Sequence, residues 1–334
     1  MKRSSIKDIA RMAGVSVATV SYVLNRKEGV RISDETRKKI FEIAETINYK
    51  PNKIARSLKT SQSKLIGLIV ADISNDFYSG IARKIEDKAL QLGYTLIIGS
   101  CDENAEKFCK LTELFSQQQV DGMIVAPVIG SEDVMKRLMQ ERYPVVCIDR
   151  YLPEIPVPCV TVNNREISES VTRLLAEKKF EQIIYTGYKT ELAHLREREE
   201  GFDTVMNQYP EIRSKKILVG LDNIREEVCR GLEENIGKQP ESTALYFSSN
   251  KLALAGLSFL TQNQIQVPRQ VSVVAFDQTD AYHLFPAEIS YIEQPLEEMA
   301  DEAVQMLDSQ IQQYSERGKK IVLPTSLQLK NSIQ

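Results

Sequence analysis

Residues 16–25 bring together side chains that could contact a DNA duplex. Valine and alanine can touch thymine methyl groups, while serine and tyrosine can exchange hydrogen bonds with base edges in the major groove. The candidates for base contact are Val17, Ala18, Ser21 and Tyr22. The candidates for phosphate contact are Ser5, Ser16, Thr19 and Asn25, with added positive charge from Arg31. These residue types favour a helix that enters the major groove.

The charge of the chain is divided in a way that supports this interpretation. Residues 1–60 hold 14 lysines and arginines against 6 aspartates and glutamates, whereas the other residues hold 29 basic and 40 acidic side chains. A small basic segment on a larger acidic body is typical of a nucleic-acid-binding module joined to another domain. A basic face that is merely solvated would carry the same charge. Only the predicted helices within the segment can therefore distinguish a DNA-binding module from a basic face without a partner.

Motifs for several common kinds of catalysis are missing. The sequence has no G-x-x-x-x-G-K-[ST] phosphate loop, no G-x-G-x-x-G fingerprint and no G-x-S-x-G nucleophile turn. The two histidines are far apart, and we expect His194 at the surface and His283 in a loop. The five cysteines lack C-x-x-C spacing, as expected for reduced thiols in a cytoplasmic protein. We predict no enzyme activity, no catalytic residue, no metal site and no cofactor.

The pattern of the basic segment, which we call the head, predicts three helices, two of which flank a tight turn. Residues 5–8, Ser-Ile-Lys-Asp, have the form of a capping box that opens a helix. Gly14 can adopt the left-handed conformation that ends this helix. Ser16 caps a second helix over 17–24, and a third helix starts after Ser33. Two short helices joined by a glycine-containing turn in a basic segment predict an all-α helix-turn-helix head.

In the rest of the chain, apolar strand-like runs alternate with helical patterns. The runs lie at 65–73, 94–101, 122–127, 144–149, 159–163, 182–187, 216–220, 243–249 and 271–277. This alternation of strands and helices predicts parallel sheets covered by helices. The number of predicted strands is too large for one small sheet. We therefore predict an α/β body with two doubly wound parallel-sheet lobes.

Ligands of open α/β folds bind beyond the carboxyl ends of the strands. The candidates for ligand contact by this rule, or at a crossover, are Asn75, Phe77, Tyr78, Asp149, Arg198, Ser249, Asn250, Asp277 and Gln294. Such polar groups beside aromatic faces suit a polyhydroxylated ligand, and the arginine also suits an anion. Plain structural alternatives exist: Asp149 and Asp277 could cap helices, Phe77 and Tyr78 could be core residues, and Arg198 could pair with neighbouring glutamates.

The segment from Ser5 to Asn25, SIKDIARMAGVSVATVSYVLN, resembles the N-terminal signature of the LacI/GalR family of bacterial transcription regulators at nearly every position. Residues 49–60 resemble the hinge segment of these repressors. The resemblance implies a short helix that forms on DNA, with Leu58 wedged into the minor groove and with Ala55 and Arg56 at groove-facing positions. The alternative is a plain linker in which Leu58 is buried.

The body resembles the periplasmic-binding-protein fold of the same regulators, with two lobes, three crossovers and a cleft. This implies a DNA-binding domain at 1–49, a hinge and linker at 50–63, and an effector-binding and dimerisation domain at 64–334. The implied lobes are 64–161 with 294–320, and 162–293 with 321–334. The resemblance therefore implies that a last strand, at 321–329, joins the second lobe. By the same resemblance, Arg198 matches an effector-contacting arginine, and Asp277 matches a carboxylate that often receives a ligand hydroxyl.

The predicted function is a ligand-responsive repressor of carbohydrate-related genes in the bacterial cytoplasm, associated with the nucleoid. We expect it to bind a pseudo-palindromic, double-stranded DNA operator as a homodimer, without a membrane partner. The expected effector is a sugar, a sugar acid or a sugar phosphate. Two alternatives remain open: control by a protein corepressor, and a non-regulatory sugar-binding protein with an incidental basic head.

Overall fold

The computed structural model of the chain describes residues 5–25, 29–49, 62–236, 242–315 and 318–334. The chain forms two compact units, the head (Met1–Ser63) and the body (Lys64–Gln334). The expected hinge residues Ala55, Arg56 and Leu58 lie outside the described residues. Within the described ranges, no helix is both long enough and apolar enough to cross a membrane.

The head contains the three predicted helices, α1 (Ile6–Ala13), α2 (Val17–Leu24) and α3 (Asp34–Thr46). Each begins after a serine whose hydroxyl accepts a hydrogen bond from a first-turn N–H, which a helix start otherwise leaves unpaired. Gly14 ends α1 with a φ of 73°. Ile9, Val20, Val23 and Ile40 form a small fully buried core. The predicted helix-turn-helix is confirmed.

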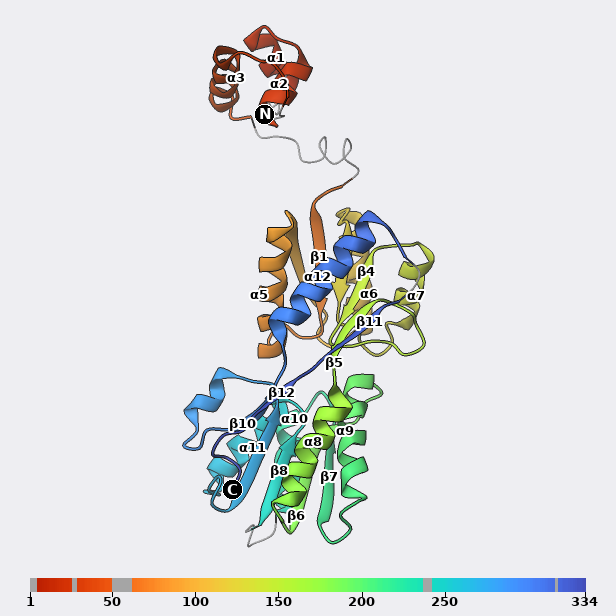
Figure 1. The fold of residues 1–334 in the computed structure, drawn as a ribbon, viewed down its shortest axis with the longest axis vertical. Coiled ribbons are helices and arrows are strands. Elements are labelled where there is room, and N and C mark those ends of the chain that lie inside the picture. Colours follow the sequence, from red (N-terminus) through yellow and green to blue (C-terminus); the bar gives the residue numbers. More distant parts are fainter. Residues whose placement is uncertain (1–4, 26–28, 50–61, 237–241, 316–317) are drawn as a thin grey trace. The chain divides into compact units, whose positions relative to one another are not determined.

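The first lobe of the body is built on a six-stranded sheet in the order β11-β5-β4-β3-β1-β2. Its strands are β1 (Leu65–Val70), β2 (Thr95–Ser100), β3 (Gly122–Val125), β4 (Val145–Ile148), β5 (Cys159–Val162) and β11 (Lys320–Leu323). Its helices are α5 (Asp76–Gln91), α6 (Ala105–Gln117), α7 (Glu132–Gln140) and α12 (Leu296–Gln312). Figure 1 shows α12 running across the first sheet, and α12 is in contact with β3, β4 and β5.

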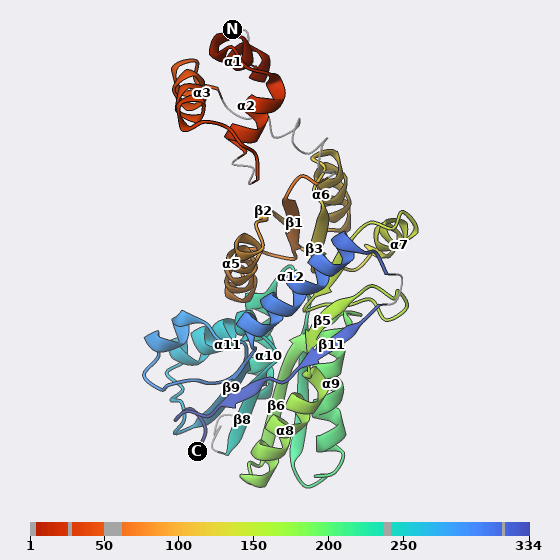
Figure 2. The ribbon, with the colours of Figure 1, turned by 45° about the horizontal axis from the view of Figure 1, so that its top comes forward.

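The second lobe has a six-stranded sheet in the order β12-β10-β9-β8-β6-β7. Its strands are β6 (Gln182–Tyr188), β7 (Arg213–Val219), β8 (Thr243–Phe247), β9 (Val271–Phe276), β10 (Ser290–Glu293) and β12 (Ser326–Gln328). Its helices are α8 (Asn164–Glu177), α9 (Ala193–Met206), α10 (Ile224–Asn235) and α11 (Asn250–Gln262), followed by a 3-10 turn at Asp280–Leu284. Figure 2 shows α8 and α9 side by side, as their dense mutual contacts also indicate.

The two sheets follow the same strand order, so β4 in the first lobe and β9 in the second occupy equivalent positions. All strand pairs are parallel except that of β10 with β12. The inner strands are buried along their length, as expected for parallel sheets covered by helices on both faces. The predicted α/β body with two doubly wound lobes is confirmed.

The last predicted strand differs from the expectation that all of 321–329 joins the second lobe. Its first part, β11, pairs with β5 of the first sheet, and only β12 pairs with β10 of the second. The break falls at Pro324, which has no N–H to donate to a ladder. Thr325 N then donates to Asn163 Oδ1 at 2.9 Å, which fixes the chain at another crossover. Residues 320–323 therefore belong to the first sheet.

Candidate functional site

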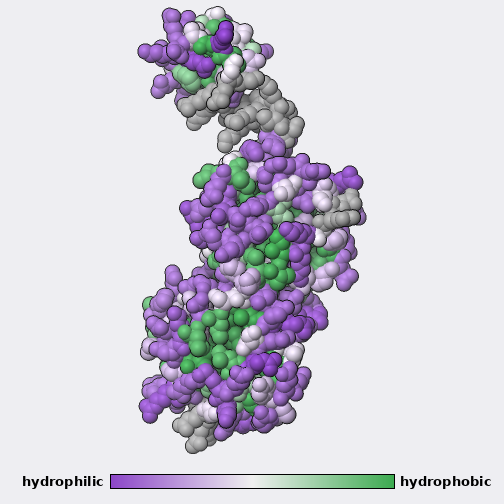
Figure 3. Space-filling model, in the orientation of Figure 1, coloured by the Kyte–Doolittle hydropathy of each residue, from purple (hydrophilic) through white to green (hydrophobic). Residues whose placement is uncertain are grey.

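The first turn of α2 exposes apolar side chains that the core of the head does not use. Val17 is 41% exposed, and Ala18 is also exposed. Ser21 and Tyr22 are half-buried one turn further along the helix. An exposed valine beside small and hydroxyl side chains is available for contacts with base edges. Figure 3 shows that the visible face of the head is mostly hydrophilic, with smaller hydrophobic patches.

The predicted phosphate contacts lie at the ends of the head helices. Ser5 caps α1, and Ser16 Oγ caps α2 by accepting from Thr19 N at 3.0 Å. Asn25 follows α2, and its Nδ2 donates to Ser21 O at 2.8 Å. Arg31 is exposed. The caps fix the helix N-termini, whose remaining N–H groups and partial positive charge suit phosphate oxygens.

In the body, a cavity of about 370 Å³ lies between the two lobes, and we call it the cleft. The predicted ligand contacts that line it are Asn75, Phe77, Tyr78, Asp149, Arg198, Ser249, Asp277 and Gln294. Asn250 is not among its lining residues; its Nδ2 instead donates to Asn75 Oδ1 at 2.9 Å, across the two lobes. The strand-end rule thus brings together side chains that are up to about two hundred residues apart in sequence.

Arg198 on α9 is buried, with 3% of its surface exposed. Its Nε donates to Asn164 Oδ1 at 2.8 Å, and its Nη1 donates to Ser248 O at 2.8 Å. The guanidinium carbon lies 3.4 Å from the centre of the Phe276 ring. Across the described part of the chain, no carboxylate lies within ion-pair distance of Arg198, so the alternative of pairing with neighbouring glutamates is wrong. The residue is held in place by neutral groups.

Asp149 follows β4 and Asp277 follows β9, and both have a left-handed backbone, with φ of 64° and 69°. Tyr78 Oη donates to Asp149 Oδ2 at 2.8 Å, and Gln294 Nε2 donates to Asp277 Oδ1 at 2.6 Å. Burial raises the pKa of Asp149, an effect that the positive charges of Arg150 and Arg198 oppose. Burial also raises the pKa of Asp277, to about 6. Strained, buried carboxyls with altered pKa values are typical of functional sites.

The comparisons with known proteins agree with this architecture. Residues 5–52 match the model of the bacterial regulatory proteins of the lacI family, and residues 172–333 match the periplasmic binding protein-like domain. The HTH-type transcriptional regulator RegA of Clostridium saccharobutylicum is 31% identical over 306 residues, which cover 91% of each chain. The chain belongs to the LacI family of bacterial regulatory proteins.

Two further relatives support the same assignment of this LacI-family chain. The ribose operon repressor of Halalkalibacterium halodurans is 29% identical over 97% of this chain and 95% of that protein. The solved structure of the lac repressor dimer, bound to operator and an anti-inducer, has a TM-score of 0.84 at 21% identity and covers 99% of both chains. The protein is therefore a DNA-binding transcription regulator with a helix-turn-helix head and a periplasmic-binding-protein-like body.

The cleft of this LacI-family regulator also contains charged side chains that are not among the predicted ligand contacts. Arg150 forms two hydrogen bonds with the carboxylate of Glu103, at 2.6 and 2.7 Å. Lys251 of the second lobe pairs with Asp72 of the first. Glu103 comes shortly after β2, so the strand-end rule could have identified it. The two pairings themselves depend on tertiary structure and leave no signal in the sequence.

The expectation that His194 lies at the surface is wrong. It lies in the first turn of α9, is 4% exposed and lines the cleft. Burial and the positive charges of Arg150 and Arg198 hold the pKa of His194 well below its usual range, so its imidazole is neutral at pH 7. Its Nδ1 has no hydrogen-bond partner among the described residues. Within the same residues, no cluster of histidine, cysteine, aspartate and glutamate could hold a metal ion.

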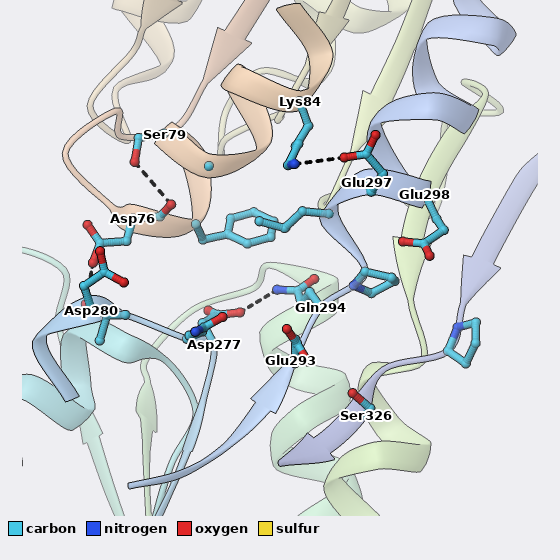
Figure 4. A pocket seen from close by; sticks show the side chains of 17 residues that line it. Asp76, Ser79, Lys84, Asp277, Asp280, Glu293, Gln294, Glu297, Glu298 and Ser326 are labelled. Carbon is cyan, nitrogen blue, oxygen red and sulfur yellow. Dashed lines mark hydrogen bonds and ion pairs between the residues drawn. The ribbon is translucent and has the colours of Figure 1, made fainter. Parts of the chain in front are cut away.

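A second hollow, of about 880 Å³, shares Phe77, Asp277 and Gln294 with the cleft. Figure 4 shows Gln294 turned toward Asp277, and Lys84 of α5 paired with Glu297 of α12. Both lobes contribute to this hollow, since its walls include the first turns of α5 and α12 and the loop after β9. The Asp277–Gln294 hydrogen bond therefore lies between two cavities.

We predict that an Asp277→Asn variant is more stable than the wild type at pH 7.5. A carboxyl whose pKa rises from 3.8 to about 6 on folding favours folding fully below pH 3.8, and this contribution is lost as the pH rises through 6. The neutral amide removes the cost of burying the charge, about 3 kcal/mol. Urea unfolding at pH 7.5 and pH 5 measures the gain, which should be smaller at pH 5; a destabilised variant at pH 7.5 would contradict the argument.

Proposed function

We propose that this LacI-family regulator binds an inverted-repeat operator as a homodimer, represses transcription in the bacterial cytoplasm, and changes its DNA affinity when a sugar-type effector occupies the cleft. The observation that carries the effector role is Arg198, a buried arginine held by neutral groups beside the carboxylates of Asp149 and Asp277. A buried charge without an ion-pair partner is costly in a protein interior. A ligand in the cleft would complete its hydrogen bonds.

The names of the relatives support the sugar-type effector and the repressor role. One is a ribose operon repressor, and the lac repressor structure contains both an operator and an anti-inducer. We place the DNA-binding domain at 1–49, the hinge at 50–63 and the effector domain at 64–334. A two-fold dimer presents two α2 helices, so it requires a two-fold DNA site.

Selection of binding sites from random double-stranded DNA tests the DNA-binding part of the proposal. The purified full chain should enrich an inverted repeat, and its affinity should fall steeply as salt rises, because phosphate contacts release counterions. No preference for any inverted repeat over random DNA would overturn the proposal. Adding sugars to the binding reaction then tests the response, which should appear as a change in operator affinity.

A Leu58→Ala variant is expected to bind the operator at least tenfold more weakly while its dimerisation stays unchanged. The proposed leucine wedge bends the duplex and so allows extra contacts, which alanine is too small to produce. Fluorescence anisotropy with operator DNA measures the affinity, and analytical ultracentrifugation measures the dimer. Unchanged operator affinity would show that Leu58 is part of a plain linker.

A further inference from the structure

The described residues that line the cleft carry more negative than positive side chains. The carboxylates are Asp72, Asp102, Glu103, Asp149, Asp222 and Asp277, whereas the cations are Arg150, Arg198 and Lys251. Asp102 pairs with Lys107, which does not line the cavity. With that pair left aside and with both buried carboxyls, Asp149 and Asp277, protonated, three carboxylates would still match the three cations. The cleft therefore has no excess positive charge with which to attract an anion.

Two of the three cations in the cleft are already neutralised by partners of their own. Glu103 binds the guanidinium of Arg150 through two hydrogen bonds in the bidentate geometry that carboxylates and arginines prefer. Asp72 pairs with Lys251. These two pairs occupy the groups that would otherwise bind a phosphate or a carboxylate of a ligand.

The third cation, Arg198, lies within electrostatic reach of two carboxyls. Its charge lowers the pKa values of Asp149 and Asp277 against the larger opposing effect of burial. The charge of Asp149 in turn raises the pKa of Asp277, so the two carboxyls repel each other. An anionic ligand at Arg198 would add a further negative charge to this group in a site of low dielectric constant.

The open hydrogen-bonding groups of the cleft require donors as well as acceptors from a ligand. Gln294 Oε1 is buried without a hydrogen-bond partner among the described residues and can only accept. Asp149 Oδ2 accepts from Tyr78 and lies 3.9 Å from Arg150 Nε, while Asp277 Oδ1 accepts from Gln294, so each carboxyl keeps a second oxygen that a ligand can reach. In the part of the chain that the structure describes, Arg150 Nε is a buried donor without a hydrogen-bond partner. A hydroxyl group can donate and accept at once, whereas a phosphate or a carboxylate brings acceptors only.

We propose that the cleft selects a neutral polyol, an uncharged sugar, and discriminates against the phosphorylated and acidic forms of the same sugar. This inference rests on the proposed effector role of the cleft and narrows it to one chemical class. The cavity of about 370 Å³ lies at the small end of the range for small-molecule sites, roughly 300–1,000 Å³. His194, which also lines the cleft, is held neutral by burial and by the charges of Arg150 and Arg198, so it adds no fourth positive charge that could attract an anion.

Thermal unfolding of the full chain with matched sets of ligands tests this selectivity. Each set contains one neutral pentose, hexose or disaccharide with its phosphate, its sugar acid and its amino sugar. At least one neutral sugar should raise the melting temperature in a saturable way, and its charged forms should bind at least tenfold more weakly by calorimetry. Stabilisation only by charged members, or by no neutral sugar, would overturn the proposal.

Variants locate the binding in the cleft. The stabilisation by a neutral sugar should disappear in Asp277→Asn and persist in Glu211→Gln, which removes an exposed carboxylate outside the cleft. Loss of stabilisation in both variants, or in neither, would place the ligand elsewhere and overturn the proposal.

A Glu103→Gln variant gives a test that does not depend on finding the sugar. It removes the partner that neutralises Arg150, so inorganic phosphate at millimolar concentration should stabilise this variant saturably, at constant ionic strength. The wild type should show no saturable effect. Equal stabilisation of the wild type and the variant by phosphate would overturn the proposal; if Glu103→Gln does not fold, the ligand sets and the wild-type phosphate titration still decide.

The failure of this inference can be told apart from the failure of the proposed function. If the chain enriches an inverted repeat and only anionic sugars change its operator affinity, the regulator role stands and the selectivity for neutral sugars is wrong. If it shows no sequence preference in DNA, the proposed function itself is wrong, whichever sugar binds.

Discussion

An Arg198→Ala variant is expected to lose the effector response completely while it binds the operator with wild-type affinity in the absence of effector. The substitution removes the cleft cation that neither Glu103 nor Asp72 neutralises, and it leaves Asn164 Oδ1 and Ser248 O without this donor. It also removes the contact with the Phe276 ring. Unpaired buried acceptors and the uncompensated carboxyls should lower the free energy of unfolding by about 3 kcal/mol. Operator titrations with and without effector measure the response, and urea unfolding measures the stability.

Two further variants separate the roles of Arg198. Arg198→Met keeps an apolar chain over Phe276 but removes the charge and the hydrogen bonds, so it should lose the response with a smaller loss of stability. Arg196→Ala is the matched control, because Arg196 lies on the same helix, is exposed and, within the described residues, pairs with the solvent-accessible Glu191 and Glu200. It should change stability by less than about 0.5 kcal/mol. A normal response in Arg198→Ala would remove Arg198 from the effector site.

A Gly201→Ala variant is expected to be destabilised by about 2–3 kcal/mol, although alanine normally stabilises a helix relative to glycine by about 1 kcal/mol. A Cβ at this position of α9 would lie 2.6 Å from Arg165 O and 2.8 Å from Ser168 Cβ on α8. Because one of these atoms belongs to the backbone, the two helices must separate. The separation would also displace Arg198, one turn earlier, so effector affinity should fall together with stability.

Gly80→Ala on α5 is the control for this prediction. Its Cβ would meet only the end of a flexible side chain, Leu296 Cδ1, at 3.1 Å. It should leave stability unchanged or raise it by up to about 1 kcal/mol. Thermal and urea unfolding of both variants provide the comparison. Equal effects of the two substitutions would show that the α8–α9 contact has no special role in holding the cleft.

The parts of the structure that depend on local signals could be predicted from the sequence. The capping serines and Gly14 specify the ends of the head helices through bonds within a few residues. The apolar runs predicted the buried strands because the pattern that marks each strand lies within the strand itself. Asp149 and Asp277 were found because the carboxyl end of a parallel strand is itself a position in the fold, and it follows directly from the strand assignment.

The features that the sequence did not predict depend on contacts between distant segments. The burial of His194 results from the packing of the start of α9 against the cleft, which no periodicity in its own helix reveals. The pairing of Arg150 with Glu103 joins residues from two different strand ends. The last segment could pair with the edge strand of either sheet, because both edges have unpaired backbone N–H and C=O groups. The sequence pattern alone therefore did not predict that β11 joins the first sheet and β12 the second.

The matching strand orders of the two lobes have a consequence for the energetics of closure. Asp149 and Asp277 follow equivalent strands and share the same unusual backbone conformation, so bringing the lobes together sets two like charges against each other. Closing the cleft without a ligand therefore has an electrostatic cost, because the two carboxylates repel each other. A bound molecule that donates a hydrogen bond to each carboxylate would weaken the repulsion between Asp149 and Asp277. Part of its affinity would therefore come from relieving a repulsion that exists because both lobes place a carboxylate after the equivalent strand.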